Sequence, residues 1–269
     1  MPAPEIKLVV FDWAGTIIDH GCLAPAGAFV ACFAARGVAV TTAEARGPMG
    51  LHKKDHLRAM LGTESVGGKW RAAVGRAWTE ADVEDLYRDV TPRQVEAAER
   101  YSGLIAGVPE VVARLRAKGI KVASSTGYFT QAAQVVLSAA GRQGYVPDFN
   151  ICADEVPAGR PAPWMLFRCM EQTGVFPPAA VLKVGDTVID IEDGLNAGCW
   201  SVGVTDTSNE MGLSEADLHS LPEAERASRR ADITARYQKA GAHAVIRDVT
   251  EVPALVEELN ARLARGERP

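Results

Sequence analysis

Short apolar runs, several of which stop abruptly at small polar or acidic residues, constrain the fold of this chain more than any other feature. These runs occupy residues 7–11, 120–124, 181–184, 200–204 and 244–246. Helical patterns lie between them, such as 109–118, ended by Gly119, and 130–140, ended by Gly141. Strands that alternate with helices of this length predict an α/β fold with a doubly wound parallel sheet.

Residues 20–101 interrupt this alternation, because no strand pattern occurs among them. Helical patterns there cover 25–36, 42–60 and 80–100. We therefore expect an α/β core domain, 1–19 and 102–269, with a helical cap domain, 20–101, inserted after the first strand. Open α/β sheets bind ligands beyond the carboxyl ends of their strands, so the cap would lie over the ligand site and act as a lid.

Composition excludes several classes of protein. A chain of 269 residues with 47% hydrophobic content can fill a sizeable core, and its net charge of −5, without a basic run, argues against a nucleic-acid partner. The five cysteines are scattered and form no Cys-x-x-Cys pair, which predicts neither a disulfide framework nor a zinc knuckle. No apolar stretch approaches the roughly 20 residues of a membrane span. We expect a soluble, cytoplasmic protein without a membrane partner.

Four polar clusters fall at the ends of predicted strands or in a loop before a helix. They are DWAGT from Asp12, SSTG ending at Gly127, GRP around Arg160 and GDTVID from Gly185. Any one of them has a structural explanation, since aspartates and glycines also cap helices and shape loops. In a parallel sheet, however, all of them should meet at one edge. Together they supply carboxylates for a hard cation, hydroxyl and backbone donors, and a guanidinium, which is the equipment of phosphoryl transfer.

The order and spacing of these clusters resemble the haloacid dehalogenase superfamily. The resemblance implies a nucleophile at Asp12, a phosphate-binding hydroxyl at Thr126, a cation at Arg160 and an acidic metal motif at Asp186 and Asp190. Phosphatases of that superfamily carry a second aspartate two residues after the nucleophile, where this chain has Ala14. That aspartate protonates an alkoxide leaving group. Either the enzyme is weakened, or its leaving group is not an alkoxide.

The segment MGLHKKDH, within the predicted cap, places apolar and ionisable side chains on one helical face. This stripe contains Met49, Lys53, His56 and Met60. A desolvated lysine beside an imidazole has a lowered pKa and can attack a carbonyl to form a Schiff base. Two alternatives remain. In the first, Lys53 and Lys54 would be surface residues beside a packing stripe. In the second, His52 and His56, at i and i+4, would bind zinc, although the glutamate base of a zinc helix is missing.

DWAGT, Cys22, MGLHKKDH, STGY, PAGRP and GDTVID together resemble the phosphonoacetaldehyde hydrolase (phosphonatase) family over nearly the whole chain. Members of that family cleave the carbon–phosphorus bond of phosphonoacetaldehyde to give acetaldehyde and phosphate. The resemblance implies a Schiff base on Lys53 and an aspartyl phosphate on Asp12. An iminium would let the carbon leave as a neutral enamine, so no acid at position 14 would be required.

The same resemblance implies the remaining roles. Proton transfer falls to His56, with assistance from Cys22, Tyr128 and Met49; phosphonate binding falls to Thr126, Gly127, Arg160 and Gly50. Mg²⁺ would be held by Asp12, the carbonyl of Ala14 and Asp186, while Asp190 orients these ligands. Cys22 also fits as a small buried hydrophobe and Tyr128 as a packing aromatic. A homodimer through the cap is expected.

Two competing functions stay open at the level of sequence. A phosphomonoesterase or phosphosugar mutase of the same fold would use Asp12 but would have no need of Lys53. A regulatory domain phosphorylated on Asp12, with the cap as a protein-binding element, would need neither Arg160 nor Thr126.

Overall fold

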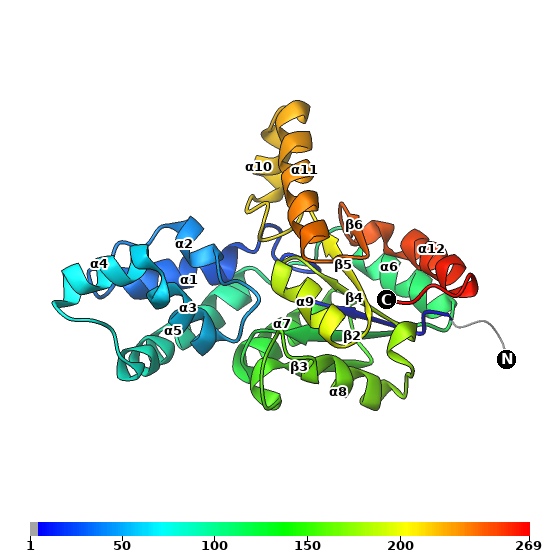
Figure 1. The fold of residues 1–269 in the computed structure, drawn as a ribbon, viewed down its shortest axis with the longest axis horizontal. Coiled ribbons are helices and arrows are strands. Elements are labelled where there is room, and N and C mark those ends of the chain that lie inside the picture. Colours follow the sequence, from blue (N-terminus) through cyan, green and yellow to red (C-terminus); the bar gives the residue numbers. More distant parts are fainter. Residues whose placement is uncertain (1–4) are drawn as a thin grey trace.

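A parallel six-stranded sheet forms the centre of the computed structural model, which describes residues 5–269 (Figure 1). Its strands are β1 (Leu8–Phe11), β2 (Lys121–Thr126), β3 (Phe149–Cys152), β4 (Val181–Gly185), β5 (Trp200–Val204) and β6 (Ala244–Ile246). Their order is β3-β2-β1-β4-β5-β6, and every neighbouring pair is parallel. The order reverses beside β1, which makes the carboxyl end of β1 a switch point of the doubly wound sheet. The predicted α/β fold is confirmed.

Helices cover both faces of this sheet. The core helices are α6 (Val108–Ala117), α7 (Thr130–Arg142), α8 (Trp164–Thr173), α9 (Val188–Asn196), α10 (Glu215–Ser220), α11 (Glu223–Lys239) and α12 (Val252–Ala264). One buried cluster joins α6, α7 and α12 to the sheet side chains that include Val9 and Phe11, and another joins α8 to Leu8 and Val10. Alternate residues of β1 therefore pack on opposite layers, as a strand buried on both faces requires.

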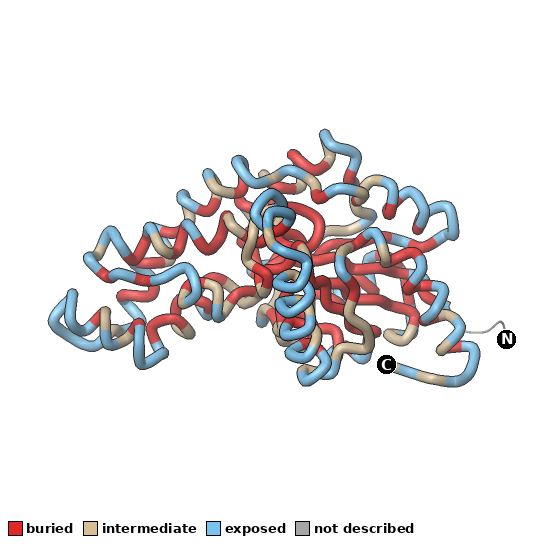
Figure 2. Tube along the Cα trace, turned by 90° about the horizontal axis from the view of Figure 1, so that it is seen from above, coloured by how far each residue is buried: buried red, intermediate tan, exposed pale blue. Residues whose placement is uncertain are grey.

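Five helices lie between β1 and α6 and pack on one another to one side of the sheet (Figure 1). They are α1 (Leu23–Ala34), α2 (Thr42–Arg46), α3 (Lys53–Gly62), α4 (Glu64–Val74) and α5 (Glu80–Arg100). Their facing sides form a hydrophobic cluster of their own, which includes Phe29, Phe33 and Trp70. Figure 2 shows these buried sides turned inward and the exposed sides turned outward. The helical insert expected after the first strand is present.

The single helix predicted for residues 42–60 is wrong. Helix α2 ends at Arg46, α3 begins at Lys53, and the two are joined by a loop, residues 47–52. Gly50 in this loop has φ 95°, a left-handed conformation that breaks the helix and that glycine adopts at little cost. Met49 consequently lies in the loop and not on a helix with Lys53. All four residues of the predicted stripe are nevertheless buried: Met49, Lys53, His56 and Met60.

Strand β3 and helix α4 are among the elements that escaped the sequence patterns. Strand β3 is a four-residue edge strand, FNIC, whose polar Asn150 obscures an apolar run. Helix α4 contains Gly67 and Gly68, which have low helix propensity, and it is started by the Thr63 hydroxyl accepting from the Val66 N–H.

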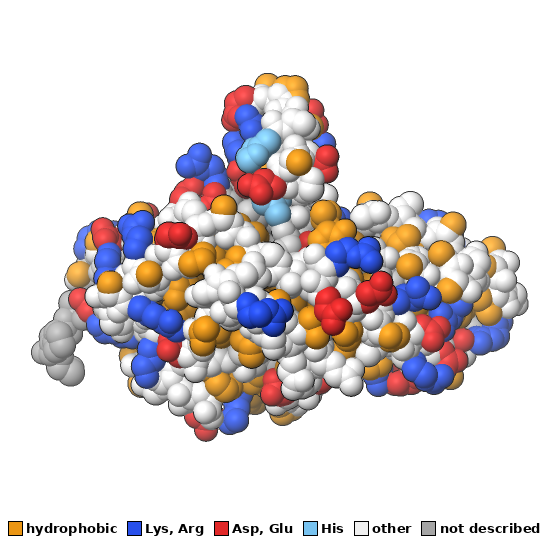
Figure 3. Space-filling model, turned by 180° about the vertical axis from the view of Figure 1, so that it is seen from behind, with side chains coloured by type: hydrophobic (Ala, Val, Ile, Leu, Met, Phe, Trp, Pro, Cys, Tyr) orange, Lys and Arg blue, Asp and Glu red, His pale blue; other side chains and the backbone are white. Residues whose placement is uncertain are grey.

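Helices α10 and α11 project from the core as an arm (Figure 1). Helix α11 buries only Ile233 and Tyr237. Charged and histidine side chains cover much of this arm in Figure 3. In the described part of the chain, residues 5–269, we find no helix with the length and apolar character that a bilayer crossing needs.

Candidate active site

The central strands bring three polar clusters to one edge of the sheet. Phe11, the last residue of β1, is in register with Ser124 of β2 and with Val184 of β4. Asp12 therefore follows β1 at the level where Thr126 ends β2 and Asp186 follows β4, and the Asp12 N–H donates to the Val184 carbonyl at 2.9 Å. The meeting of these clusters, predicted from parallel pairing, is observed.

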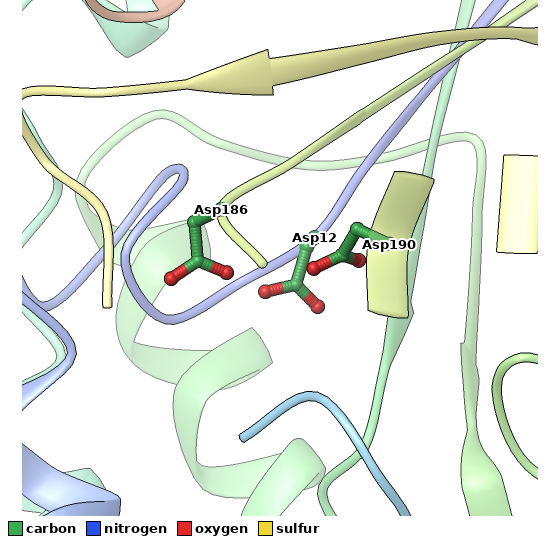
Figure 4. A group of neighbouring side chains, drawn as sticks. All are labelled: Asp12, Asp186 and Asp190. Atoms are coloured by element: carbon green, nitrogen blue, oxygen red, sulfur yellow. The ribbon is translucent and has the colours of Figure 1, made fainter. Parts of the chain in front are cut away.

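Asp12, Asp186 and Asp190 form a buried acidic group (Figure 4). One carboxylate oxygen from each lies within 4.8 Å of the others. Glycines make this approach possible: a Cβ on Gly185 would lie 2.2 Å from the Asp190 Cβ, and one on Gly15 would lie 2.1 Å from the Asp186 Oδ2. Among residues 5–269, this is the one group of at least three acidic, histidine or cysteine side chains close enough to share a metal ion.

Two buried cations compensate part of this charge. Arg160 places Nη2 2.7 Å from Asp12 Oδ1 and Nη1 2.8 Å from Asp190 Oδ1. Lys183, on β4, also lies 2.8 Å from Asp190 Oδ1. Although burial opposes it, these two cations lower the pKa of Asp190 to about 2. Asp190 is thus ionised and already paired, which suits a residue that orients the site better than one that binds a metal directly.

Asp186 is the carboxylate without a cationic partner among the described residues. Its Oδ2 accepts one hydrogen bond, from the Asn209 N–H at 2.8 Å. Burial, together with the negative charges of Asp12 and Asp190, raises the pKa of Asp186 well above its ordinary value. A hard dication bound between Asp186 and Asp12 would offset this repulsion, and oxygen-only donors are those that Mg²⁺ prefers. The donor set fits such an ion.

Lys53 enters the site from the cap. It is the first residue of α3, its exposed fraction is 4%, and its Nζ lies 5.2 Å from the centre of the Tyr128 ring and 5.8 Å from that of Phe29. Burial lowers the pKa of Lys53 to about 8. The positive end of the α3 dipole acts in the same direction. No salt bridge to the Lys53 amine occurs among residues 5–269, and a buried amine with a lowered pKa is suited to act as a nucleophile.

Lys53 and Asp12 line the same pocket between the cap and the sheet edge. Ten further residues complete its wall: Ala14, Cys22, Pro25, Met49, Gly50, Thr126, Gly127, Tyr128, Arg160 and Asp186. Loop 47–52 closes against the core, since a Cβ on Gly127 would lie 2.9 Å from the Leu51 carbonyl oxygen. All the predicted site residues except His56 and Asp190 thus surround one space.

His56 lies behind Lys53 and outside the lining of this pocket. It is fully buried and stacks on Phe29 with ring centres 3.9 Å apart, and its Nε2 lies 2.9 Å from the Ala45 carbonyl oxygen. A carbonyl only accepts, so Nε2 carries the proton and Nδ1 keeps its lone pair. Burial and the neighbouring Lys53 charge lower the pKa of His56 well below its ordinary value. The ring is therefore neutral, and its Nδ1 has no hydrogen-bond partner among residues 5–269.

The zinc alternative at His52 and His56 has no support in the geometry. The His52 Nδ1 accepts from the Lys54 N–H at 3.3 Å, which caps α3, and the His56 Nε2 faces the Ala45 carbonyl. Neither histidine belongs to a group of three metal-binding side chains within residues 5–269.

Sequence reasoning missed three buried residues that shape this site. Lys183 stands out as a lysine inside an apolar strand, and Asp193 follows Asp190 by one helical turn on α9, with Oδ2 3.6 Å from the Arg160 Nε. Both positions could have been predicted from the sequence, because a charged residue in an apolar segment is rarely buried without a partner. Asn209 lies in an irregular loop and carries no such signal.

Comparison with known proteins identifies the family. The haloacid dehalogenase-like hydrolases match residues 6–198. A phosphonoacetaldehyde hydrolase of Syntrophobacter fumaroxidans is 44% identical over 264 residues, 98% of this chain and 95% of that protein. One of Paraburkholderia phytofirmans is 40% identical over 98% of this chain and 99% of its own length. The crystal structure of a phosphonoacetaldehyde hydrolase-like protein from Oleispira antarctica has a TM-score of 0.96 at 41% identity, covering 99% of this chain and 96% of that one. The chain belongs to the phosphonoacetaldehyde hydrolase family of the haloacid dehalogenase-like hydrolases.

Proposed function

We propose that this protein hydrolyses the carbon–phosphorus bond of phosphonoacetaldehyde, with Lys53 as the Schiff-base amine and Asp12 as the nucleophile toward phosphorus. One observation carries the proposal: a buried lysine with a lowered pKa and a strand-end aspartate line the same pocket. An ordinary phosphate ester needs no amine, whereas an aldehyde that carries a phosphonate needs both groups. Relatives that match nearly the whole chain are named for the same reaction.

Imine formation is the first step. The neutral Lys53 amine adds to the aldehyde carbon, and loss of water leaves an iminium whose carbon lies two bonds from phosphorus. His56 is neutral, with Nδ1 as a base behind Lys53. Burial raises the pKa values of Cys22 and Tyr128 well above their ordinary values, so both stay protonated as donors. We assign proton transfer in this step to His56, with Cys22 and Tyr128 assisting and Met49 packing beside the amine.

Carbon–phosphorus cleavage follows. Asp12 attacks phosphorus as the carbon–phosphorus bond breaks, and the bonding electrons pass to the iminium, which becomes a neutral enamine. Protonation at carbon and hydrolysis release acetaldehyde and free Lys53. Water then hydrolyses the aspartyl phosphate to phosphate and Asp12. The carbon leaves without forming an alkoxide, so the reaction needs no proton donor at position 14, where this chain has Ala14.

Binding of the phosphonate group falls to donors at the sheet edge. Thr126, Gly127 and Arg160 line the pocket around Asp12, and Gly50 faces them from the cap. The two Nη atoms of Arg160 pair with Asp12 and Asp190, and we assign its charge to the phosphonate oxygens that approach Asp12.

Magnesium is the cation that we assign to the acidic group. Asp12, Asp186 and the carbonyl of Ala14 would hold it, with Asp190 orienting the set. When bound, Mg²⁺ supplies electrostatic stabilisation to the phosphonate oxygens and reduces repulsion between them and the attacking carboxylate.

The larger organisation of the protein is also part of the proposal. We assign residues 20–101 to a cap domain and 1–19 with 102–269 to the core; residues 1–4 lie outside those described. We further propose a cytoplasmic homodimer that associates through the cap. All five cysteines are free thiols, which suits a reducing compartment.

A product assay tests the function. Purified protein with Mg²⁺ should release acetaldehyde and phosphate from phosphonoacetaldehyde in equal amounts, and should turn over an alkyl phosphate ester about a hundredfold less efficiently, since no acid at position 14 protonates the alkoxide. Efficient cleavage of the ester, with an inert phosphonate, would instead identify a phosphomonoesterase.

A further inference from the structure

Arg46 ties the cap to the core at the end of α2. Its Nη1 donates to the carbonyl oxygen of Gly21 at 2.7 Å and to Oδ1 of Asn209 at 3.1 Å, and its Nη2 donates to the carbonyl oxygen of Gly212 at 3.4 Å. Gly21 belongs to the segment that leaves the core for the cap, whereas Asn209 and Gly212 belong to the core loop after β5. A single side chain of α2 thus joins two stretches of the chain, the segment at Gly21 and the loop 209–212.

The core end of this contact continues to the acidic group. The Asn209 N–H donates to Asp186 Oδ2 at 2.8 Å, and Asn209 is almost fully buried. Asp186 has no cationic partner among the described residues, so this N–H fixes the direction of its carboxylate. Arg46 itself touches neither Asp186 nor Asp12. The connection from the cap to the carboxylate therefore passes through Asn209.

The backbone is shaped around the guanidinium. Gly212 has φ 67°, and a Cβ there would lie 3.3 Å from the Arg46 Cζ. Gly21 has φ 84°, and a Cβ there would lie 2.1 Å from the Leu213 carbonyl oxygen. The left-handed conformations of Gly21 and Gly212 let the segment at Gly21 and the loop 209–212 approach Arg46 closely.

The cap end of the contact continues to the loop that leads to Lys53. The Arg46 carbonyl accepts from the Met49 N–H at 3.0 Å and from the Asn209 Nδ2 at 3.4 Å. Loop 47–52 is therefore bonded to Arg46, the residue whose side chain also bonds to the core loop 209–212. Arg46 therefore contacts both segments, loop 47–52 through its carbonyl and Asn209 through its carbonyl and its guanidinium.

We propose that Arg46 and Asn209 are positioning residues that orient Asp186 for its metal ion when the cap is seated on the core. The inference rests on the proposed function only for the assignment of that ion to Asp186. Without the Arg46 contact, loop 209–212 loses its anchor, the Asn209 N–H no longer holds Oδ2 in place, and the ion binds a less organised site. Loss of such an outer partner weakens metal binding about 10- to 100-fold in other proteins.

Direct binding of Mn²⁺ tests this coupling without any substrate. The fraction of free Mn²⁺, read from its electron paramagnetic resonance signal, gives dissociation constants for the full-length protein and for Arg46→Ala and Asn209→Ala. Each variant should bind about tenfold more weakly. Arg36→Ala is the matched control, because Arg36 pairs with Asp89 inside the cap, at 2.6 Å, and should bind Mn²⁺ normally.

The double variant sharpens the result. If the coupling runs through Asn209, then Arg46→Ala with Asn209→Ala should bind Mn²⁺ no more weakly than Arg46→Ala alone. Arg46→Lys, which keeps the charge but cannot reach all the acceptors, should be weakened too and serves if Arg46→Ala does not fold. Unchanged binding in Asn209→Ala or in both Arg46 variants, or equal weakening in Arg36→Ala, would overturn the proposal. If the variants bind Mn²⁺ more weakly as expected but the parent protein does not act on phosphonoacetaldehyde, the proposed function alone would be contradicted.

Discussion

The guanidinium of Arg160 holds the carboxylate of Asp12 in a buried ion pair, with Nη2 2.7 Å from Oδ1. The other end of the same fork meets Asp190 at 2.8 Å. Burial raises the pKa of Asp12, and the Arg160 charge is the largest influence that opposes this rise. Arg160 therefore both orients the Asp12 carboxylate and favours its ionised form.

Replacing this fork by a single ammonium tests its geometry. Arg160→Lys should reduce kcat/KM at least about a hundredfold, because lysine keeps the charge but cannot bridge Asp12 and Asp190. Alanine would leave Asp12 unpaired and Asp190 with Lys183 as its remaining cation, and would endanger folding. Steady-state kinetics on Arg168→Lys, whose parent arginine is an exposed partner of Glu171, provides the control. Activity within fivefold of the parent in Arg160→Lys would argue against a bidentate role.

The lowered pKa of Lys53 predicts the pH dependence. Because the neutral amine attacks the aldehyde, kcat/KM should rise with pH and level off with an apparent pKa near 8, where an ordinary lysine titrates near 10.5. Lys54→Gln should keep this profile, since the Lys54 Nζ bonds to Glu84 on the cap at 2.8 Å. A rise that continues to pH 10 would contradict burial as the source of reactivity.

The same burial predicts a gain of stability when the charge is removed. Lys53→Met should raise the free energy of unfolding at pH 7 by about 1–3 kcal/mol, the order expected for a pKa lowered from 10.5 to about 8. Since the pKa is lower in the folded state, the cost of the charge is complete below pH 8 and shrinks as pH rises toward 10.5. Urea unfolding at pH 7 and pH 10 measures both. A less stable Lys53→Met protein at pH 7 would refute this reading.

Gly50 provides a test of how closely the cap must approach. Its φ of 95° strains any side chain, and a Cβ there would lie 2.7 Å from the Thr187 Oγ1 and 3.0 Å from the Ile189 Cβ. Gly50→Ala should push loop 47–52 off the core and lower kcat/KM about a hundredfold, since a shift of roughly 1 Å costs that much. Gly68→Ala, on the exposed side of α4 with open space around it, should leave kinetics unchanged. Equal kinetics in both variants would show that loop 47–52 tolerates displacement.

Sequence patterns predicted the sheet well because its strands are apolar and its helices end at glycines. Strands β5 and β6 and helix α5 were predicted with their observed bounds. The break between α2 and α3 was not predicted, since the stripe from Met49 to Met60 keeps a helical period across a loop. Asp12, Asp186 and Lys53 were found because their neighbours form motifs. Arg46 and Asn209 were not, because a contact between a helix end and a distant loop leaves no spacing in the sequence.

Trapping the imine tests whether Lys53 forms a Schiff base and Asp12 attacks phosphorus. Asp12→Asn protein, unable to attack phosphorus, is incubated with phosphonoacetaldehyde and borohydride, and the adduct is located by peptide mass spectrometry. We expect a reduced adduct on Lys53 of the Asp12→Asn protein, with Lys54 unmodified and turnover abolished. An Asp12→Asn protein that still turns over, or an active parent protein that forms no adduct on Lys53 under the same conditions, would contradict it.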